Sequence, residues 1–203
     1  MVIRAAPGER WTIRNRIVQF TGQSLDVFDA QGNTVAFCRQ KAFRLREDIR
    51  LYTDSTRTEE LLTMRARTII DFSVTYDITL PDATVLGSLR RKGMRSLIRN
   101  NWIAYTPDDN PQPIGELIED SASAAVMRRF IPLYELFAPK ILHLKDVQGN
   151  PIATFRTHHN PFVHRLGISI HREHPLLDDF VILAAGCLFM TIDGRQRSSA
   201  AAH

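Results

Sequence analysis

The sequence predicts a mostly all-β fold: a closed β-barrel of about 12 strands that encloses a hydrophobic C-terminal helix. Two observations lead to this prediction. Every residue from 180 to 190 is apolar or glycine, and a helix that is apolar on all sides must be enclosed on all sides. The chain before this run reads as short strands separated by turn-forming residues. A barrel encloses such a helix, whereas a sandwich does not, and barrel closure also removes exposed sheet edges.

Size and composition favour a single domain. The chain has 203 residues, of which 44% are hydrophobic, and its formal net charge is +4. We expect a flexible N-terminal tail over residues 1–10, one barrel domain over residues 11–195, and a flexible C-terminal tail over residues 196–203. The opening MVIRAAPGER contains no apolar segment of the secretory type. We therefore expect a cytoplasmic protein, with a peripheral position at the membrane as a further option.

The strands are expected in hairpin units whose turns contain Asp, Asn, Gly and Pro, the residues that tolerate or preset turn dihedrals. A first short strand covers residues 11–13. Turns follow at residues 29–33, 54–55, 81–82 and 108–111, and within DVQGNPIA at residues 146–153, which echoes DAQGNTVA at residues 29–36. A final strand, PFVHRLGISI, leads into the central helix.

The central helix has recognisable start and stop signals. Pro175 and the acids Asp178 and Asp179 stand at its front edge, and Gly194 follows its end. Its apolar run is too short for a membrane span, which needs about 20 apolar residues. A second, short helix is expected outside the barrel over residues 121–130, because good helix formers there are followed by Pro132.

Two stretches carry a resemblance to known families. The opening RIVQFTGQSLDVFDAQGNTVAFCRQKAFRLREDIRLY resembles the LURP-one-related family, and HPLLDDFVILAAGCLFMTID resembles the C-terminal helix of the phospholipid scramblase family. The likeness extends from Trp11 to about Gly194 and places the chain near the Tubby C-terminal-like superfamily. It implies the same architecture, a barrel around a hydrophobic helix. One fold hosts many functions, so the resemblance specifies fold better than activity.

The chain also departs from the scramblase pattern. It has neither the proline-rich N-terminal region nor the cysteine cluster for acylation that scramblases carry. Where scramblases have a calcium-binding loop, the stretch ISIHREHPLLDDF places His171, Arg172 and His174, whereas calcium prefers carboxylate and carbonyl oxygens. Calcium-triggered lipid scrambling is therefore not expected.

The candidate lipid-binding residues form a basic cluster in GSLRRKGMRSLIRNNW: Arg90, Arg91, Lys92, Arg95 and Arg99. Strand alternation sends Arg90 and Lys92 to one face and Arg91 to the other, and the apolar interior favours the strand end for all three. Beside Trp102 and Tyr105, the cluster could hold lipid phosphates while the aromatics lie at headgroup level. Tubby-like domains are similar in binding phosphoinositide headgroups through basic residues. The alternative is a solvated surface that only maintains solubility.

Other ligands are less well supported. Nucleic acid is not expected, because acids interrupt a continuous basic stripe at Asp77, Asp82, Asp108 and Asp109. The histidines lack metal-ligand spacing, so no metal is expected; they are His158, His159, His164, His171 and His174. The sequence contains no G-x-S-x-G nucleophile motif, no phosphate-binding loop and no dinucleotide-binding motif. We therefore expect neither enzymatic activity nor a bound cofactor. Cys38 and Cys187 are expected as buried, reduced thiols.

The function expected from the sequence is a non-enzymatic binding module for anionic phospholipid headgroups at a membrane surface. One alternative is a scramblase that moves lipids across the bilayer. The other is a regulatory scaffold in which the barrel presents loops to a protein partner.

Overall fold

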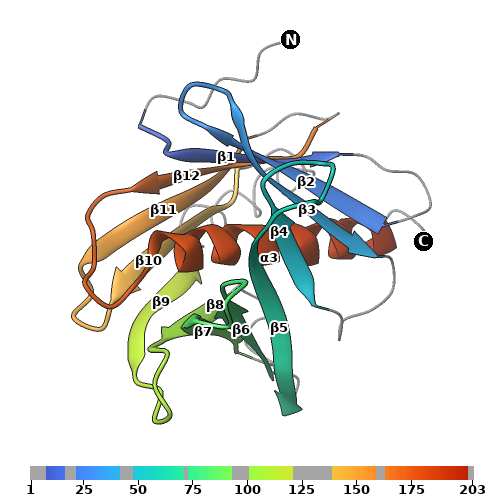
Figure 1. Ribbon diagram of the computed structural model, residues 1–203. Coiled ribbons are helices and arrows are strands. Elements are labelled where there is room, and N and C mark those ends of the chain that lie inside the picture. The colour runs from blue at the N-terminus through green and yellow to red at the C-terminus, as the bar shows by residue number, and fades with distance from the viewer. Residues whose placement is uncertain are drawn as a thin grey trace.

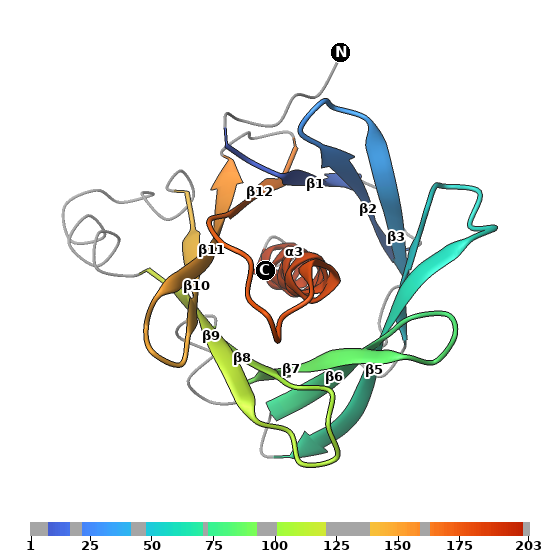
Figure 2. The ribbon, with the colours of Figure 1, turned by 60° about the vertical axis from the view of Figure 1, so that its left-hand side comes forward.

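The computed structural model describes residues 8–16, 22–41, 48–70, 73–92, 101–120, 139–158 and 163–200. They form a closed barrel of twelve antiparallel strands in which each strand pairs with its neighbour in the sequence, and β1 pairs with β12 to close the ring. The helix α3 runs through the middle of the barrel (Figures 1 and 2). The predicted all-β barrel around one C-terminal helix is thus confirmed.

The strands have the following bounds: β1 Trp11–Arg16, β2 Gly22–Asp29, β3 Thr34–Lys41, β4 Ile49–Tyr52, β5 Glu60–Ile70, β6 Ser73–Thr79, β7 Val85–Arg91, β8 Asn101–Tyr105, β9 Pro113–Glu119, β10 Ile141–Asp146, β11 Pro151–His158 and β12 Arg165–Ile170. The five predicted turns fall between β2 and β3, β4 and β5, β6 and β7, β8 and β9, and β10 and β11. These hairpin turns lie at one end of the barrel, here called the turn end; the other is the far end.

Two turns with the same sequence pattern have the same structure. The Asp29 carboxylate accepts a hydrogen bond from the Asn33 backbone N–H at 2.8 Å, and Asp146 accepts one from Asn150 at the same distance. Gly32 and Gly149 adopt φ values of 90° and 87°, which favour glycine. The echo between the two sequences therefore reflects one turn geometry used twice.

The helix α3 (Asp179–Ala200) begins where its capping signals predict. The backbone N–H of Phe180 donates to the Asp178 carboxylate at 2.7 Å, which satisfies a donor that the first helical turn leaves free. Asp179 binds Arg10 at 2.6 Å. The predicted end at Gly194 is wrong, since the helix continues to Ala200. Glycine weakens a helix by about 1 kcal/mol but does not stop it without a left-handed cap.

The barrel core is built around α3. Residues 181–185 and 187–190 are at most 4% exposed and pack against inward-facing strand residues. Gly186 allows the closest approach: a β-carbon there would lie 2.7 Å from the Ile168 Cδ1 atom and 2.9 Å from that of Ile13. At Gly186 the helix therefore lies against the seam where β1 and β12 close the barrel.

Two boundaries of the domain differ from those predicted. Residues 9 and 10, which were expected in a flexible tail, are attached to the barrel: Glu9 is 8% exposed, and the Arg10 N–H donates to the Ile168 carbonyl at 2.8 Å. Residues 196–200, expected in the C-terminal tail, continue α3. The predicted outer helix over residues 121–130 lies outside the described residues.

Candidate functional site

The three described members of the predicted basic cluster, Arg90, Arg91 and Lys92, lie at the far end of the barrel, where β7 ends. Arg90 is exposed on the outer face, between Thr75 of β6 and Ile103 of β8 in the strand register. It has no ion-pair partner among the described residues. Arg90 is thus the described member of the cluster that is best placed to meet a ligand from solution.

Arg91 faces the barrel interior, as strand alternation predicts. It lies opposite Trp102, which is 1% exposed and belongs to the core. Burial lowers the pKa of Arg91, and the neighbouring Tyr76 acts in the opposite direction. The half-buried guanidinium of Arg91 thus lies just inside the far end of the barrel.

Lys92 is already paired. Its ammonium group forms an ion pair with Glu116 of β9. Burial raises the pKa of Glu116, but the hydrogen bonds from Lys92 and Asn101, together with the Lys92 charge, outweigh it and lower the pKa overall. The pair leaves Lys92 with little net charge to offer a headgroup. Arg95 and Arg99 lie outside the described residues.

The two aromatic residues do not lie where the sequence suggested. Trp102 is buried in the core, with its ring centroid 6.1 Å from that of Tyr76. Tyr105 ends β8 at the turn end, away from the basic cluster. The prediction of aromatics at headgroup level beside the cluster is therefore wrong, because strand alternation turns Trp102 inward with Ala104.

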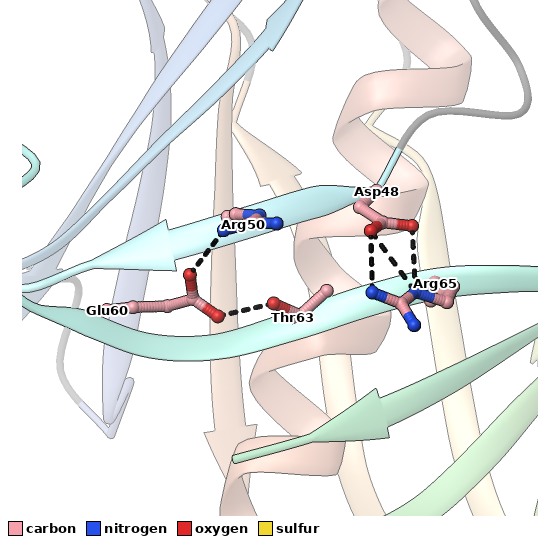
Figure 3. Close-up of polar contacts among 5 residues, drawn as sticks. All are labelled: Asp48, Arg50, Glu60, Thr63 and Arg65. Atoms are coloured by element: carbon pink, nitrogen blue, oxygen red, sulfur yellow. Dashed lines mark hydrogen bonds and ion pairs between the residues drawn. The ribbon is translucent and has the colours of Figure 1, made fainter. Parts of the chain in front are cut away.

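Several other arginines on the outer face have carboxylate partners. Figure 3 shows two of them on β4 and β5: Arg50 binds Glu60 at 3.0 Å, and Arg65 binds Asp48 through both carboxylate oxygens. Arg67 likewise pairs with Asp77. Such exposed pairs contribute little stability, but they neutralise the surface locally.

A second basic region, which the sequence did not suggest, lies on the outer face at the seam. Arg14 of β1 stands directly opposite Arg165 of β12, and His158 of β11 lies next along the same row. Neither Arg14 nor Arg165 has an ion-pair partner among the described residues. The sequence does not indicate that Arg14 and Arg165 are neighbours, because β1 and β12 meet only when the barrel closes.

The histidines do not converge. His158 contacts the Glu9 carboxylate at 2.5 Å, and the His171 Nε2 atom lies 2.8 Å from the Thr154 hydroxyl. In the part of the chain that the structure describes, no group of three or more His, Cys, Asp or Glu residues is placed to hold a metal ion. His159 lies outside that part.

The stretch before α3 engages its polar groups locally. Arg172 forms an ion pair with Asp146, and Asp178 and Asp179 serve the helix start and Arg10. An open hollow of about 470 Å³ at the turn end is lined by this stretch and by the β8–β9 turn. Its lining includes exposed Leu176 together with His174 and four acids: Asp108, Glu173, Asp178 and Asp179.

Comparisons with family models and with curated proteins find no match for this chain. The resemblance to LURP-one-related proteins and scramblases therefore stays a prediction. Within the described residues, no helix is both long enough and apolar enough to cross a membrane.

Proposed function

We propose that this protein is a non-enzymatic module that binds anionic phospholipid headgroups at the cytoplasmic surface of a membrane. The observation that carries the proposal is the exposed guanidinium of Arg90, which has no acidic partner within the described residues. Arg91 adds a second positive charge at the same end of the barrel, and Arg95 and Arg99 follow closely in the sequence. The net charge of +4 has the sign that such a surface requires.

The chemistry suits weak, reversible docking. A guanidinium binds phosphate through two parallel hydrogen bonds, and each basic residue close to an anionic membrane contributes about 1 kcal/mol. Lys92 contributes less than the sequence suggested, because Glu116 neutralises it. Binding should therefore be sensitive to salt, since surface charges are screened beyond about 10 Å at 0.1 M ionic strength.

Liposome co-sedimentation tests the proposal. The full chain should bind vesicles that contain phosphatidylserine more strongly than pure phosphatidylcholine vesicles, and the difference should fade as salt rises. Arg90→Glu should weaken this binding several-fold. Arg57→Glu is the matched control, because Arg57 is also exposed but lies in the β4–β5 turn at the other end of the barrel.

Two outcomes would contradict the proposal. Equal binding to anionic and neutral vesicles at low salt would remove the lipid function and favour a protein partner. Equal losses in Arg90→Glu and Arg57→Glu would show a diffuse charge effect without a site. A fluorescent-lipid flip assay on the same vesicles separates binding from translocation, and we expect no translocation.

A further inference from the structure

The seam between β1 and β12 brings two arginines side by side on the outer face. Arg14 and Arg165 are direct partners in the antiparallel register. Their neighbours Ile13 and Leu166 are fully buried in the core, so alternation turns both arginines outward. Directly opposed residues have β-carbons about 4.5–5.5 Å apart, and like charges in this position destabilise the pair.

Neither arginine forms an ion pair within the described residues. The Nε atom of each is shielded from solvent and donates no hydrogen bond. Each residue is half-buried, and neither has a carboxylate partner within the described residues. Their neighbour Arg16 shows the usual arrangement, since its Nε donates to Asp26 at 2.6 Å. A charged donor without an acceptor is unfavourable. The Nη atoms of both side chains are not among the shielded atoms, so they are the donors that an external acceptor can reach.

Two further basic residues on β11 lie near Arg14 and Arg165. His158 stands opposite Arg165, and Arg156, two residues earlier on β11, is exposed on the same face and has no ion-pair partner among the described residues. The two nearby acids are already engaged. The Asp26 carboxylate binds Arg16 through Oδ2, while its buried Oδ1 atom accepts no hydrogen bond. The Glu9 carboxylate contacts His158 at 2.5 Å and Thr12 at 3.3 Å.

The same acids limit the size of the ligand. Asp26 lies beside Arg14 on β2. The Glu9 side chain packs against Gly167 of β12, two residues after Arg165, so closely that a β-carbon at Gly167 would lie 1.8 Å from the Glu9 Oε1 atom. A continuous polyanion such as a nucleic acid would bring further phosphates against these carboxylates. These carboxylates therefore favour a compact anion over a polyanion.

We propose that Arg14 and Arg165 form a binding site for a single phosphate group, most favourably a dianionic phosphomonoester. Two guanidinium groups provide several N–H donors for one tetrahedral group of oxygens, and its double negative charge offsets the repulsion between them. The phosphomonoester can belong to a lipid headgroup or to a soluble metabolite. This site lies on other strands than Arg90 and does not depend on the lipid-binding proposal.

Titration of the full chain with sodium phosphate and with glycerol 3-phosphate, at constant ionic strength, tests the site by calorimetry and thermal unfolding. Both ligands should bind and raise the melting temperature, since a ligand that binds the folded state stabilises it. Arg14→Gln and Arg165→Gln should each weaken binding by about tenfold or more, the effect of losing a charge-assisted hydrogen bond. Arg39→Gln is the matched control, because Arg39 is an exposed arginine on the outer face of β3 with no ion-pair partner among the described residues.

A conservative variant guards against loss of the fold. Arg14→Lys keeps the charge and loses the planar fork, so it should fold normally and still bind phosphate several-fold more weakly. Vesicles with phosphatidic acid, compared with phosphatidylcholine vesicles, form the lipid arm. Binding there that is lost in Arg14→Gln assigns the site to a lipid, whereas binding of glycerol 3-phosphate without vesicle binding assigns it to a soluble ligand. The proposal is overturned if wild-type protein binds no phosphate, or if Arg39→Gln loses as much affinity as Arg14→Gln.

Discussion

Asp146 connects two segments of the chain at the turn end of the barrel. Its carboxylate accepts hydrogen bonds from Asn150 and Gln148 and pairs with Arg172. The Asn150 side chain, followed by its backbone N–H and by Arg172, lowers the pKa of Asp146 from 3.8 to about 2, against an opposing effect of burial. One side chain thus closes the β10–β11 hairpin and ties it to the segment that precedes α3.

This shift predicts an acid-dependent loss of stability. Because the folded-state pKa is depressed, Asp146 stabilises the protein above pH 4, and this contribution disappears as pH falls from about 4 to about 2. Asp146→Asn should therefore lower stability at pH 6 and show a smaller decrease between pH 4 and pH 2. Urea unfolding at several pH values measures the difference.

Asp109→Asn is the control for this prediction, since Asp109 is an exposed turn residue with no hydrogen bond or ion pair within the described residues. Its pH profile should follow that of the unchanged protein. A profile of Asp146→Asn that is parallel to the unchanged one would show that the carboxylate does not stabilise the turn.

At the scale of elements, α3 is the centre of the core. Leu183 is 2% exposed, whereas Leu176, seven residues earlier, is 59% exposed. Full burial of one leucine contributes about 1.5–3 kcal/mol, and an unpaired buried charge adds a further penalty. Net stabilities of single domains are about 5–15 kcal/mol, so one such change can remove much of the total.

Leu183→Asp should therefore abolish cooperative thermal unfolding or make the protein insoluble. Leu176→Asp is the same chemical change at an exposed position and should alter stability by no more than about 0.5 kcal/mol. Circular dichroism melting of the two variants checks this. A soluble Leu183→Asp variant with a normal melting transition would contradict the enclosed position of the helix.

The elements were predictable to the extent that their signals are local. All five hairpin turns and the start of α3 follow from short patterns such as Asp-x-Gln-Gly-Asn and the acids before residue 180. The end of α3 was not predictable from a local signal, because a glycine ends a helix only where it adopts a left-handed cap. The pairing of Lys92 with Glu116 and the inward position of Trp102 depend on which strands become neighbours and which face meets the core. The position of Arg14 beside Arg165 depends on barrel closure, which joins distant parts of the chain.

At the scale of the whole molecule, the two cysteines report on the opening of the barrel. Cys38 of β3 and Cys187 of α3 are both buried, and burial raises the pKa of Cys38 to about 12 and that of Cys187 well above its usual value. The thiolate is the reactive form, so both groups should be inert in the folded protein. At pH 8 we expect almost no labelling by iodoacetamide in native buffer and labelling of both thiols in urea. Rapid labelling of the native protein would indicate frequent opening of the barrel.

The order of elements along the chain has a consequence for synthesis. All twelve strands precede α3, yet the inward faces of those strands are covered by α3 side chains. A chain that leaves the ribosome therefore presents its apolar strand faces before the segment that covers them. The first and last strands must also find each other, and contacts at such long sequence separation form slowly. We expect the newly made strands to depend on chaperones until the helix emerges, so that the barrel folds around its centre only after α3 has been made.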